Sequence, residues 1–218
     1  MNYFAHGIRF LDRPYFMAGT AVPDWLSVAD RRVRMRTKRI EPLLPQWPAG
    51  SPEADVASGI LQHLSDDDWF HTTLGFHAVT GQMADLFRQT LPTDKFLNGF
   101  LGHIVTELLI DAELSQRHPG HLDQYYAAMQ QVDPHVVQQV VNACGRDATE
   151  RLAPFIPLFI AERFLHDYHD STKLLRRLNQ VMQRVKLEPL PLSVIEVLDA
   201  GRTLVAQNLP RLLPADRF

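Results

Sequence analysis

The spacing of apolar residues constrains the fold of this chain more than any other feature. From about residue 52 onward, apolar side chains recur at intervals of three and four residues. Alternating β-branched and polar runs bounded by hairpin turns are nearly absent. The sequence therefore predicts an all-α fold, a multi-helix bundle of roughly seven or eight helices.

Several helix starts carry recognisable capping signals. Ser51-Pro52 combines a capping serine with a proline in the first turn, and Asp133-Pro134 repeats the pattern. Further starts are expected at Thr93-Asp94 and, with capping-box spacing, at Ser193-Val194-Ile195-Glu196. The stretch 97–109 is apolar on most of its circumference, which is typical of a core helix.

Length and composition favour one domain. The 218 residues are 45% hydrophobic and 22% charged, enough to bury one substantial core. Four prolines between residues 41 and 52 indicate a stiff, irregular connection. We expect a single all-α domain over 1–218, with an N-terminal arm at 1–50 that contributes ligands and a helical bundle at 51–218.

Charge and cysteine content exclude some functions. A net charge of -3 does not indicate nucleic-acid binding, which normally needs a basic excess. The single cysteine, Cys144, rules out an internal disulfide and a thiolate zinc cage. No signal peptide or transmembrane segment is recognisable, so the cytoplasm is the expected location.

Histidines and carboxylates recur at helical spacing in the first half of the chain. His63, Asp67 and His71 are four residues apart, so an unbroken helix would place all three on one face. His103 and Glu107 form a second such pair, in a segment where an unpaired carboxylate would be costly. Two facing helices with such pairs can build a metal site in a bundle.

Two residues of the N-terminal arm add to this set. Asp24 follows Pro23 in what we expect to be a proline-stiffened turn, and His6 lies near the start of the chain. Imidazole and carboxylate together suit zinc, iron, manganese or nickel. We expect the histidines and carboxylates to share a metal site, although each histidine taken singly could be a hydrogen-bonded core residue.

Short motifs resemble two families of metal-dependent hydrolases. Met1-Asn2-Tyr3-Phe4-Ala5-His6, the 18–24 segment and Gly59-Ile60-Leu61-Gln62-His63 with Asp67 resemble the acyl carrier protein phosphodiesterase family, an HD-like group. Pro23-Asp24 and Phe100-Leu101-Gly102-His103 with Glu107 resemble zinc-dependent phospholipase C and its single-strand nuclease relatives. The resemblance implies an HD-like or phospholipase C-like fold.

The same resemblance implies a ligand set and a reaction. The implied metal ligands are His6, Asp24, His63, Asp67, His103 and Glu107, which would hold one or two divalent ions. His71 matches more loosely. The expected activity is hydrolysis of a phosphomonoester or phosphodiester by metal-activated water. His71 or His77 is expected to act as general acid or to support a ligand.

A basic run follows Asp24. This basic segment comprises Arg31, Arg32, Arg34, Arg36, Lys38 and Arg39. It is either a solvated face or a surface that attracts a phosphate-ester substrate, for instance one carried on an acidic carrier protein. Arg31, Arg32 and Arg34 are the predicted substrate contacts.

Three alternatives accompany the hydrolase hypothesis. The chain could be a non-catalytic helical protein with a structural or vestigial metal site and a partner-binding basic segment. The dyads His166-Asp167 and His169-Asp170 could instead define an HD-type site. A ferritin-like di-iron oxidase is disfavoured because paired Glu-x-x-His motifs are missing from the core helices.

Overall fold

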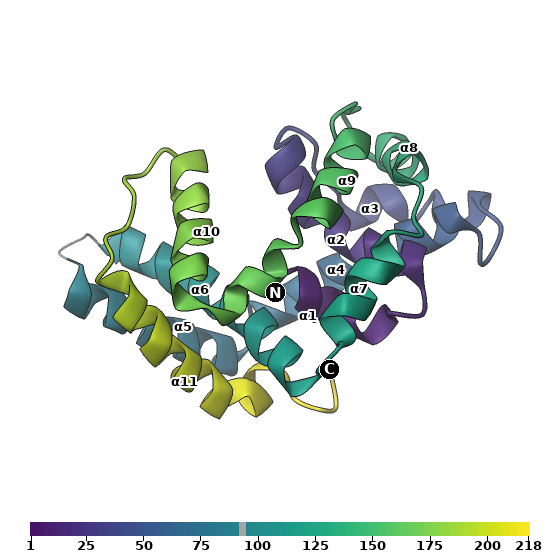
Figure 1. Ribbon diagram of the computed structural model, residues 1–218. Helices are drawn as coiled ribbons and strands as arrows, with labels where there is room; N and C mark the ends of the chain where they lie inside the picture. The colour runs from purple at the N-terminus through teal and green to yellow at the C-terminus, as the bar shows by residue number, and fades with distance from the viewer. Residues whose placement is uncertain (92–94) are drawn as a thin grey trace. The chain divides into compact units, whose positions relative to one another are not determined.

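Every regular element that the structure describes is a helix. The computed structural model describes residues 1–91 and 95–218, without the side chains of residues 95 and 96. These residues form eleven α-helices and three 3-10 helices, and none of them lies in a strand (Figure 1). The all-α prediction is confirmed, but the helices outnumber the seven or eight expected. The start predicted at Thr93-Asp94 lies outside the described residues.

Contacts within the chain group the residues into two compact units, each made of two stretches. Unit 1 comprises Met1–Asp68 and His118–Arg163, and unit 2 comprises Trp69–Arg117 and Phe164–Phe218. The expected single domain, with its division at residue 50, stays a prediction.

Unit 1 contains most of the helices. Its elements are α1 (Tyr3–Gly7), η1 (Ile8–Phe10), α2 (Pro14–Ala29), α3 (Thr37–Ile40), η2 (Leu44–Gln46), α4 (Pro52–Phe70, in unit 1 as far as Asp68), α7 (His121–Met129), α8 (Pro134–Cys144) and α9 (Leu152–Glu162). The first 50 residues are therefore largely helical, and the expectation that helices begin near residue 52 is wrong. The 41–52 connection holds only the short η2, as its prolines predicted.

Aromatic side chains fill the core of unit 1. The Phe159 ring of α9 lies 4.9 Å from the Tyr3 ring, 5.4 Å from Trp25 and 6.0 Å from Tyr126 between centroids. These rings come from α1, α2 and α7, and all four side chains are buried. Tilted and edge-on aromatic pairs stabilise such a core beyond the area they bury. The cluster fixes α1 and α2 against the rest of the unit.

Two glycines let α2 and α4 approach closely. A Cβ on Gly59 would overlap the carbonyl oxygen of Phe16, and a Cβ on Gly19 would overlap the carbonyl oxygen of Val56. Because both obstacles are backbone atoms, they cannot rotate away. This contact sets the distance between the helices that carry Asp24 and His63.

Asp24 lies in a helix, which corrects the expected turn. Pro23 is inside α2, where a proline removes one backbone hydrogen bond and costs about 3 kcal/mol. Most of the helix is nevertheless apolar and buried, including Met17, Val22 and Trp25. Burial of that surface outweighs the local preference of proline for a turn.

Unit 2 is built from longer helices. Its elements are α5 (Leu74–Thr90), α6 (Lys95–Arg117), η3 (Phe164–His169), α10 (Ser171–Arg184) and α11 (Val194–Leu212). Helices α5, α6 and α11 pack on one another. Gly201 of α11 faces Met83 of α5 and Leu109 of α6 at their junction.

The helix boundaries test the capping signals. Helix α4 starts at Pro52, α8 at Pro134 and α11 at Val194, as predicted. Ser51 Oγ accepts a hydrogen bond from Ala54 N at 3.2 Å, whereas the side chain of Ser193 makes no capping bond. None of the described helices combines the length and hydrophobicity needed to cross a bilayer.

Candidate metal centre

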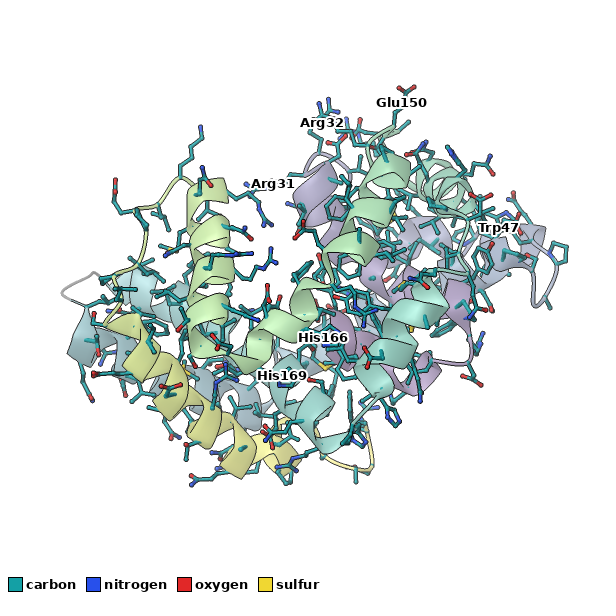
Figure 2. The ribbon with its side chains drawn as sticks, in the orientation of Figure 1. Arg31, Arg32, Trp47, Glu150, His166 and His169 are labelled. Carbon is teal, nitrogen blue, oxygen red and sulfur yellow. The ribbon has the colours of Figure 1, made fainter. Side chains whose placement is uncertain are left out.

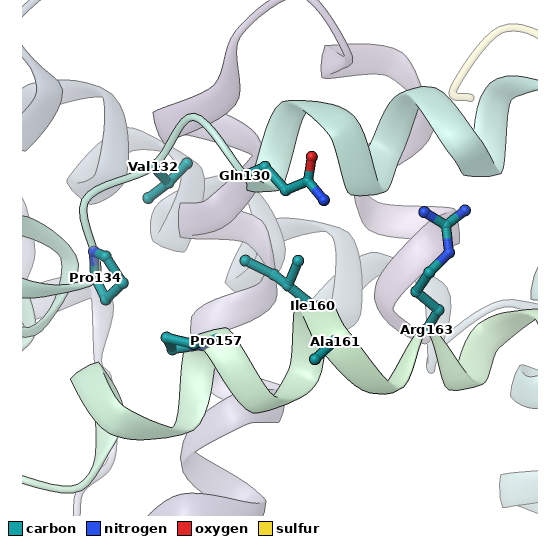
Figure 3. A pocket seen from close by; sticks show the side chains of 7 residues that line it. All are labelled: Gln130, Val132, Pro134, Pro157, Ile160, Ala161 and Arg163. Atoms are coloured by element: carbon teal, nitrogen blue, oxygen red, sulfur yellow. The ribbon is translucent and has the colours of Figure 1, made fainter.

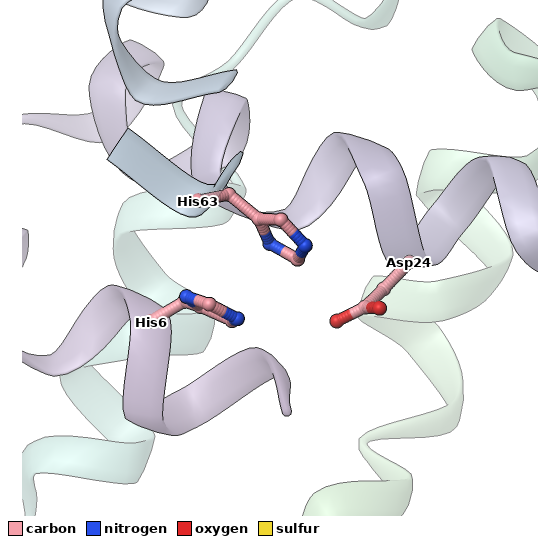
Figure 4. A group of neighbouring side chains, drawn as sticks. All are labelled: His6, Asp24 and His63. Carbon is pink, nitrogen blue, oxygen red and sulfur yellow. The ribbon is translucent and has the colours of Figure 1, made fainter. Parts of the chain in front are cut away.

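Three helices of unit 1 bring His6, Asp24 and His63 together. The residues come from α1, α2 and α4, and Figure 4 shows their side chains pointing toward a common space. One ligand atom from each lies within 4.8 Å of the others. His6 and His63 are buried, and their rings stack with centroids 3.9 Å apart. The three predicted ligands therefore form one cluster.

Asp67 completes this group. Its Oδ1 lies 3.2 Å from His6 Nε2, and its Oδ2 lies 3.4 Å from His63 Nε2. The amine of Met1 lies 2.8 Å from Asp67 Oδ1. We call His6, Asp24, His63 and Asp67 the histidine–aspartate cluster.

The backbone of α2 orients His63. The Nδ1 atom of His63 lies 2.7 Å from the carbonyl oxygen of Thr20. A carbonyl oxygen can only accept a hydrogen bond, so the proton of the ring is on Nδ1. A neutral His63 then has its lone pair on Nε2, on the side of Asp67. Metal-ligating histidines are commonly oriented by such a hydrogen bond from the other ring nitrogen.

His6 differs, since neither of its buried ring nitrogens has a hydrogen-bond partner among the described residues. Buried polar atoms without partners are rare, and an unseen ligand is one recognised cause. Two imidazoles and two carboxylates match the ligand preferences of zinc, manganese, iron and nickel. The donor set therefore fits a transition-metal ion.

The electrostatics of Asp67 favour its ionised form. Burial alone would raise the pKa of Asp67, but contacts with His6 and His63 and the nearby terminal amine hold that pKa well below its usual value. A carboxylate must be ionised to bind a cation strongly. Asp67 meets that requirement at neutral pH.

A second group lies within unit 2. His71, His103 and Glu107 each offer one ligand atom within 4.8 Å of the others. His71 Nε2 donates to Glu107 Oε1 at 2.8 Å, and His103 Nε2 lies 3.3 Å from the same oxygen. These residues are the histidine–glutamate cluster.

The position of His71 corrects the expectation of one continuous helical face. Helix α4 ends at Phe70, where Thr72 N donates to Trp69 O and Thr73 becomes the N-cap of α5. His71 therefore lies beyond the helix that carries His63 and Asp67, and joins His103 and Glu107 instead. The six predicted ligands fall into two groups, one in each unit. The i, i+4 pairing of His103 with Glu107 is confirmed.

The other predicted residues lie outside these clusters. His77 is exposed, and its one described ring contact is with Phe76. Arg31, Arg32 and Arg34 are exposed on the loop after α2, where Figure 2 labels the first two. Arg31 Nε donates to Ser27 O at 3.1 Å, and Arg32 forms a two-pronged ion pair with Asp30.

Three residues of the HD dyads near residue 167 make hydrogen bonds within unit 2. Asp167 Oδ2 accepts a hydrogen bond from Arg177 Nε at 2.7 Å, and Asp170 caps α10 by accepting from Lys173 N. His169 Nε2 lies 2.8 Å from Ser115 Oγ. Among the described residues, neither dyad belongs to a group of three or more ligating side chains.

A hollow in unit 1 is separate from the histidine–aspartate cluster. It lies between the end of α7 and α9 and is lined mainly by apolar side chains such as Val132, Pro157 and Ile160 (Figure 3). None of the predicted metal ligands lines it. It therefore adds nothing to the candidate centre.

Sequence reasoning missed the residues that surround the ligands. Asp66 is buried, its Oδ1 accepts from Gln62 Nε2 at 2.8 Å, and its Oδ2 lies 3.5 Å from His6 Nδ1. The run of three aspartates at 66–68 was visible, but only Asp67 has the spacing of a ligand. The carbonyl of Thr20 leaves no signal in a sequence.

The chain has no detected similarity to known proteins: neither the family models nor the curated proteins nor the solved structures contain a match.

Proposed function

We propose that this protein is a metal-dependent phosphoester hydrolase, acting on a phosphodiester or a phosphomonoester. The observation that carries the proposal is the convergence of His6, Asp24 and His63 from three helices, with Asp67 beside them. Four donors of this kind, two of them buried imidazoles, are an unusual arrangement for packing alone. The motif resemblance to acyl carrier protein phosphodiesterases and phospholipase C supports the same reading, including an HD-like or phospholipase C-like fold.

Each residue of the histidine–aspartate cluster has a task in this proposal. The imidazoles and carboxylates would hold a divalent ion, and the chemistry that such an ion would supply is activation of water at neutral pH and neutralisation of phosphoryl charge. Thr20 keeps the proton of His63 on Nδ1, so that Nε2 is available. Asp67 places Oδ1 beside Nε2 of His6 and Oδ2 beside Nε2 of His63, and it supplies negative charge.

The histidine–glutamate cluster is the proposed place of a second ion. His71, His103 and Glu107 would hold this ion through one ligand atom each. In this role His71 is a ligand, as its looser match in the resemblance allows, and not the general acid. His77 is the remaining candidate for the general acid, on sequence position alone.

The basic segment favours a substrate that carries negative charge. Four of its side chains are exposed and can attract such a substrate from solution: Arg34, Arg36, Lys38 and Arg39. Such a row attracts phosphate esters and acidic carrier proteins in a salt-dependent way. Arg34 is the informative residue to change, because Arg32 is already neutralised by Asp30.

A turnover assay tests the proposal. Protein loaded in turn with zinc, manganese, iron and nickel is incubated with bis(p-nitrophenyl) phosphate and with p-nitrophenyl phosphate. We expect hydrolysis of at least one ester by the wild type, and its loss in His63→Ala, which removes a ligand. His135→Ala is the matched control, since His135 is exposed on α8. If hydrolysis is found, Arg34→Gln should raise KM at low salt and leave kcat unchanged.

The assay also separates the hydrolase from its main rival. In the second reading the same cluster is a structural metal site and the chain is not an enzyme. Wild-type protein that binds metal tightly but hydrolyses neither ester with any of the four metals would favour that reading. Equal turnover by the wild type and His63→Ala would contradict the proposed site.

A further inference from the structure

Helix α10 of unit 2 concentrates positive charge on one side. Its apolar side chains recur at intervals of three and four residues and are buried, among them Leu174, Leu178 and Met182. Cations and glutamines occupy the opposite side of the helix. Residues 171–187 contain no carboxylate, and the first one that follows is Glu188. The cations of this stretch are Lys173, Arg176, Arg177, Arg184 and Lys186.

Most of these cations face the solvent. We call the exposed ones the basic face: Lys173, Arg176, Arg184 and Lys186. Arg177 is only partly exposed, and its Nη2 lies 2.7 Å from Asp167 Oδ2. Among the described residues, Lys173, Arg176 and Lys186 form no ion pair with a carboxylate. Their charge is therefore available to attract an anionic partner.

The carboxylates that contact α10 from neighbouring elements lie at its start. Asp170 accepts a hydrogen bond from the backbone nitrogen of Lys173 at 2.8 Å, and Asp199 of α11 accepts one from Ser171 Oγ at 2.6 Å. Both bonds involve the first turn of the helix. The positive charge near its end, at Arg184 and Lys186, is not reached by these groups.

Lys186 occupies a backbone position that usually favours glycine. Its φ is 62°, in the left-handed region. Lys186 N donates to Gln183 O at 3.1 Å, and Leu187 N donates to Met182 O at 2.9 Å, which is the hydrogen-bond pattern of a Schellman cap. A lysine in this conformation is strained where a glycine would not be. The helix thus ends on a cation despite the local backbone preference.

Two leucines beside the basic face are exposed although their loop is anchored. The loop joins α10 to α11 (Figure 1). Asn179 Oδ1 accepts from Leu190 N at 2.7 Å, and Asn179 Nδ2 donates to Leu190 O at 3.2 Å. Leu190 is buried, whereas Leu187 is 36% exposed and Leu192 is 76% exposed. A fixed loop therefore presents apolar side chains to the solvent next to the end of the basic helix.

We infer that the basic face of α10 and the leucines of the following loop bind the surface of an anionic lipid bilayer. Acidic headgroups attract the cations, and Leu187 and Leu192 enter the boundary between headgroups and acyl chains. Nucleic acid fits less well, because single strands are bound by stacking on aromatic side chains and residues 171–193 contain none. The inference goes beyond the proposed hydrolase and depends on neither metal site.

Vesicle sedimentation tests the role of the cations. Wild type is mixed with phosphatidylcholine vesicles and with vesicles that contain about one-third phosphatidylserine. We expect it to sediment only with the acidic vesicles, and less as salt screens the attraction. Lys173→Gln combined with Arg176→Gln should bind about 30-fold more weakly. Arg88→Gln combined with Arg146→Gln is the matched control, because it removes two exposed cations that lie outside α10.

A leucine variant tests contact with the apolar part of the bilayer. Leu192→Ser should bind acidic vesicles about 10-fold more weakly than the wild type, because serine gains little from leaving water. Leu74→Ser is the matched control, since Leu74 is 85% exposed on α5, and it should bind like the wild type. All the substituted side chains are exposed, so the thermal midpoints of the variants should match that of the wild type.

The inference has several ways to fail. It is overturned by a wild type that does not sediment with acidic vesicles, or by equal binding of the α10 double variant and its control. Equal binding of Leu192→Ser and Leu74→Ser would show that the loop does not enter the bilayer, and would overturn it as well. Retention on immobilised polyglutamate without vesicle binding would assign the basic face to an acidic protein instead. The hydrolase is tested separately, by metal content and turnover.

Discussion

At the scale of single residues, Asp30 shows how unit 1 keeps a buried carboxylate ionised. Arg32 Nε and Nη2 each donate to it at 2.9 Å, and Thr149 Oγ1 donates at 3.1 Å. Hydrogen bonds from Arg32 are the main reason that the pKa of Asp30 lies far below its ordinary value of 3.8. The contact joins the end of α2 to the segment before α9.

The lowered pKa of Asp30 predicts how stability depends on pH. A carboxyl whose pKa is depressed by folding stabilises the protein above its unfolded pKa, and this contribution is lost as pH falls toward the folded value. Asp30→Asn should therefore be less stable than the wild type at pH 7. The difference should shrink as pH falls below about 4. Urea unfolding from pH 7 to pH 3 measures it.

An exposed aspartate provides the control for this experiment. Asp12 is exposed in unit 1, so Asp12→Asn should change the free energy of unfolding little at any pH. A wild-type advantage over Asp30→Asn that grows as the pH is lowered would show that the sign of the shift is wrong.

The four ligands of the histidine–aspartate cluster could be named from the sequence, but their surroundings could not. Spacing on one helix pointed to His63 and Asp67, and motif resemblance pointed to His6 and Asp24. The structure adds Asp66 and the carbonyl of Thr20, whose contacts depend on how helices cross. His71 was misplaced because the end of α4 at Phe70 has no proline or glycine to mark it.

At the scale of elements, the contact between α2 and α4 positions the cluster, and Gly59→Ala should disrupt it. The added methyl would overlap the carbonyl oxygen of Phe16, which can be relieved only by moving a helix. We expect a loss of about 3 kcal/mol of stability, measured by urea unfolding. Weaker zinc binding should accompany it, because Thr20 and His63 lie on the two helices that must separate.

Gly81→Ala is the matched control for the same substitution. Gly81 lies within α5, is exposed, and has no atom within 4 Å of a Cβ built there. Alanine should stabilise this helix by about 0.5–1 kcal/mol. If Gly59→Ala were as stable as Gly81→Ala, the close approach of α2 and α4 would be contradicted.

Helix prediction succeeded where capping and periodicity agreed and failed where they did not. Pro52, Pro134 and Val194 start helices at the residues that the sequence marks. The turn expected around Pro23 and Asp24 is instead part of α2, because burial against other helices outweighs the local preference of proline and glycine. Helix α1 has five residues, too few to show a period.

At the scale of the whole molecule, the arrangement into two units could not be read from the sequence. Each unit combines two stretches of chain, and the first boundary falls near the end of α4. Composition does not change there, and the prolines that do punctuate the sequence lie at 42–52, inside unit 1. The histidine–aspartate and histidine–glutamate clusters consequently belong to different units.

The central claim is that the histidine–aspartate cluster binds a metal ion, and elemental analysis of the purified protein tests it most directly. Wild type, His63→Ala and His77→Ala are compared as purified without added metal and after reconstitution with zinc, manganese, iron or nickel. We predict one or two ions per wild-type chain, one fewer in His63→Ala, and no change in His77→Ala, whose side chain is exposed. A wild type that holds none of these metals after reconstitution, or a His63→Ala variant that holds as much as the wild type, would contradict the account.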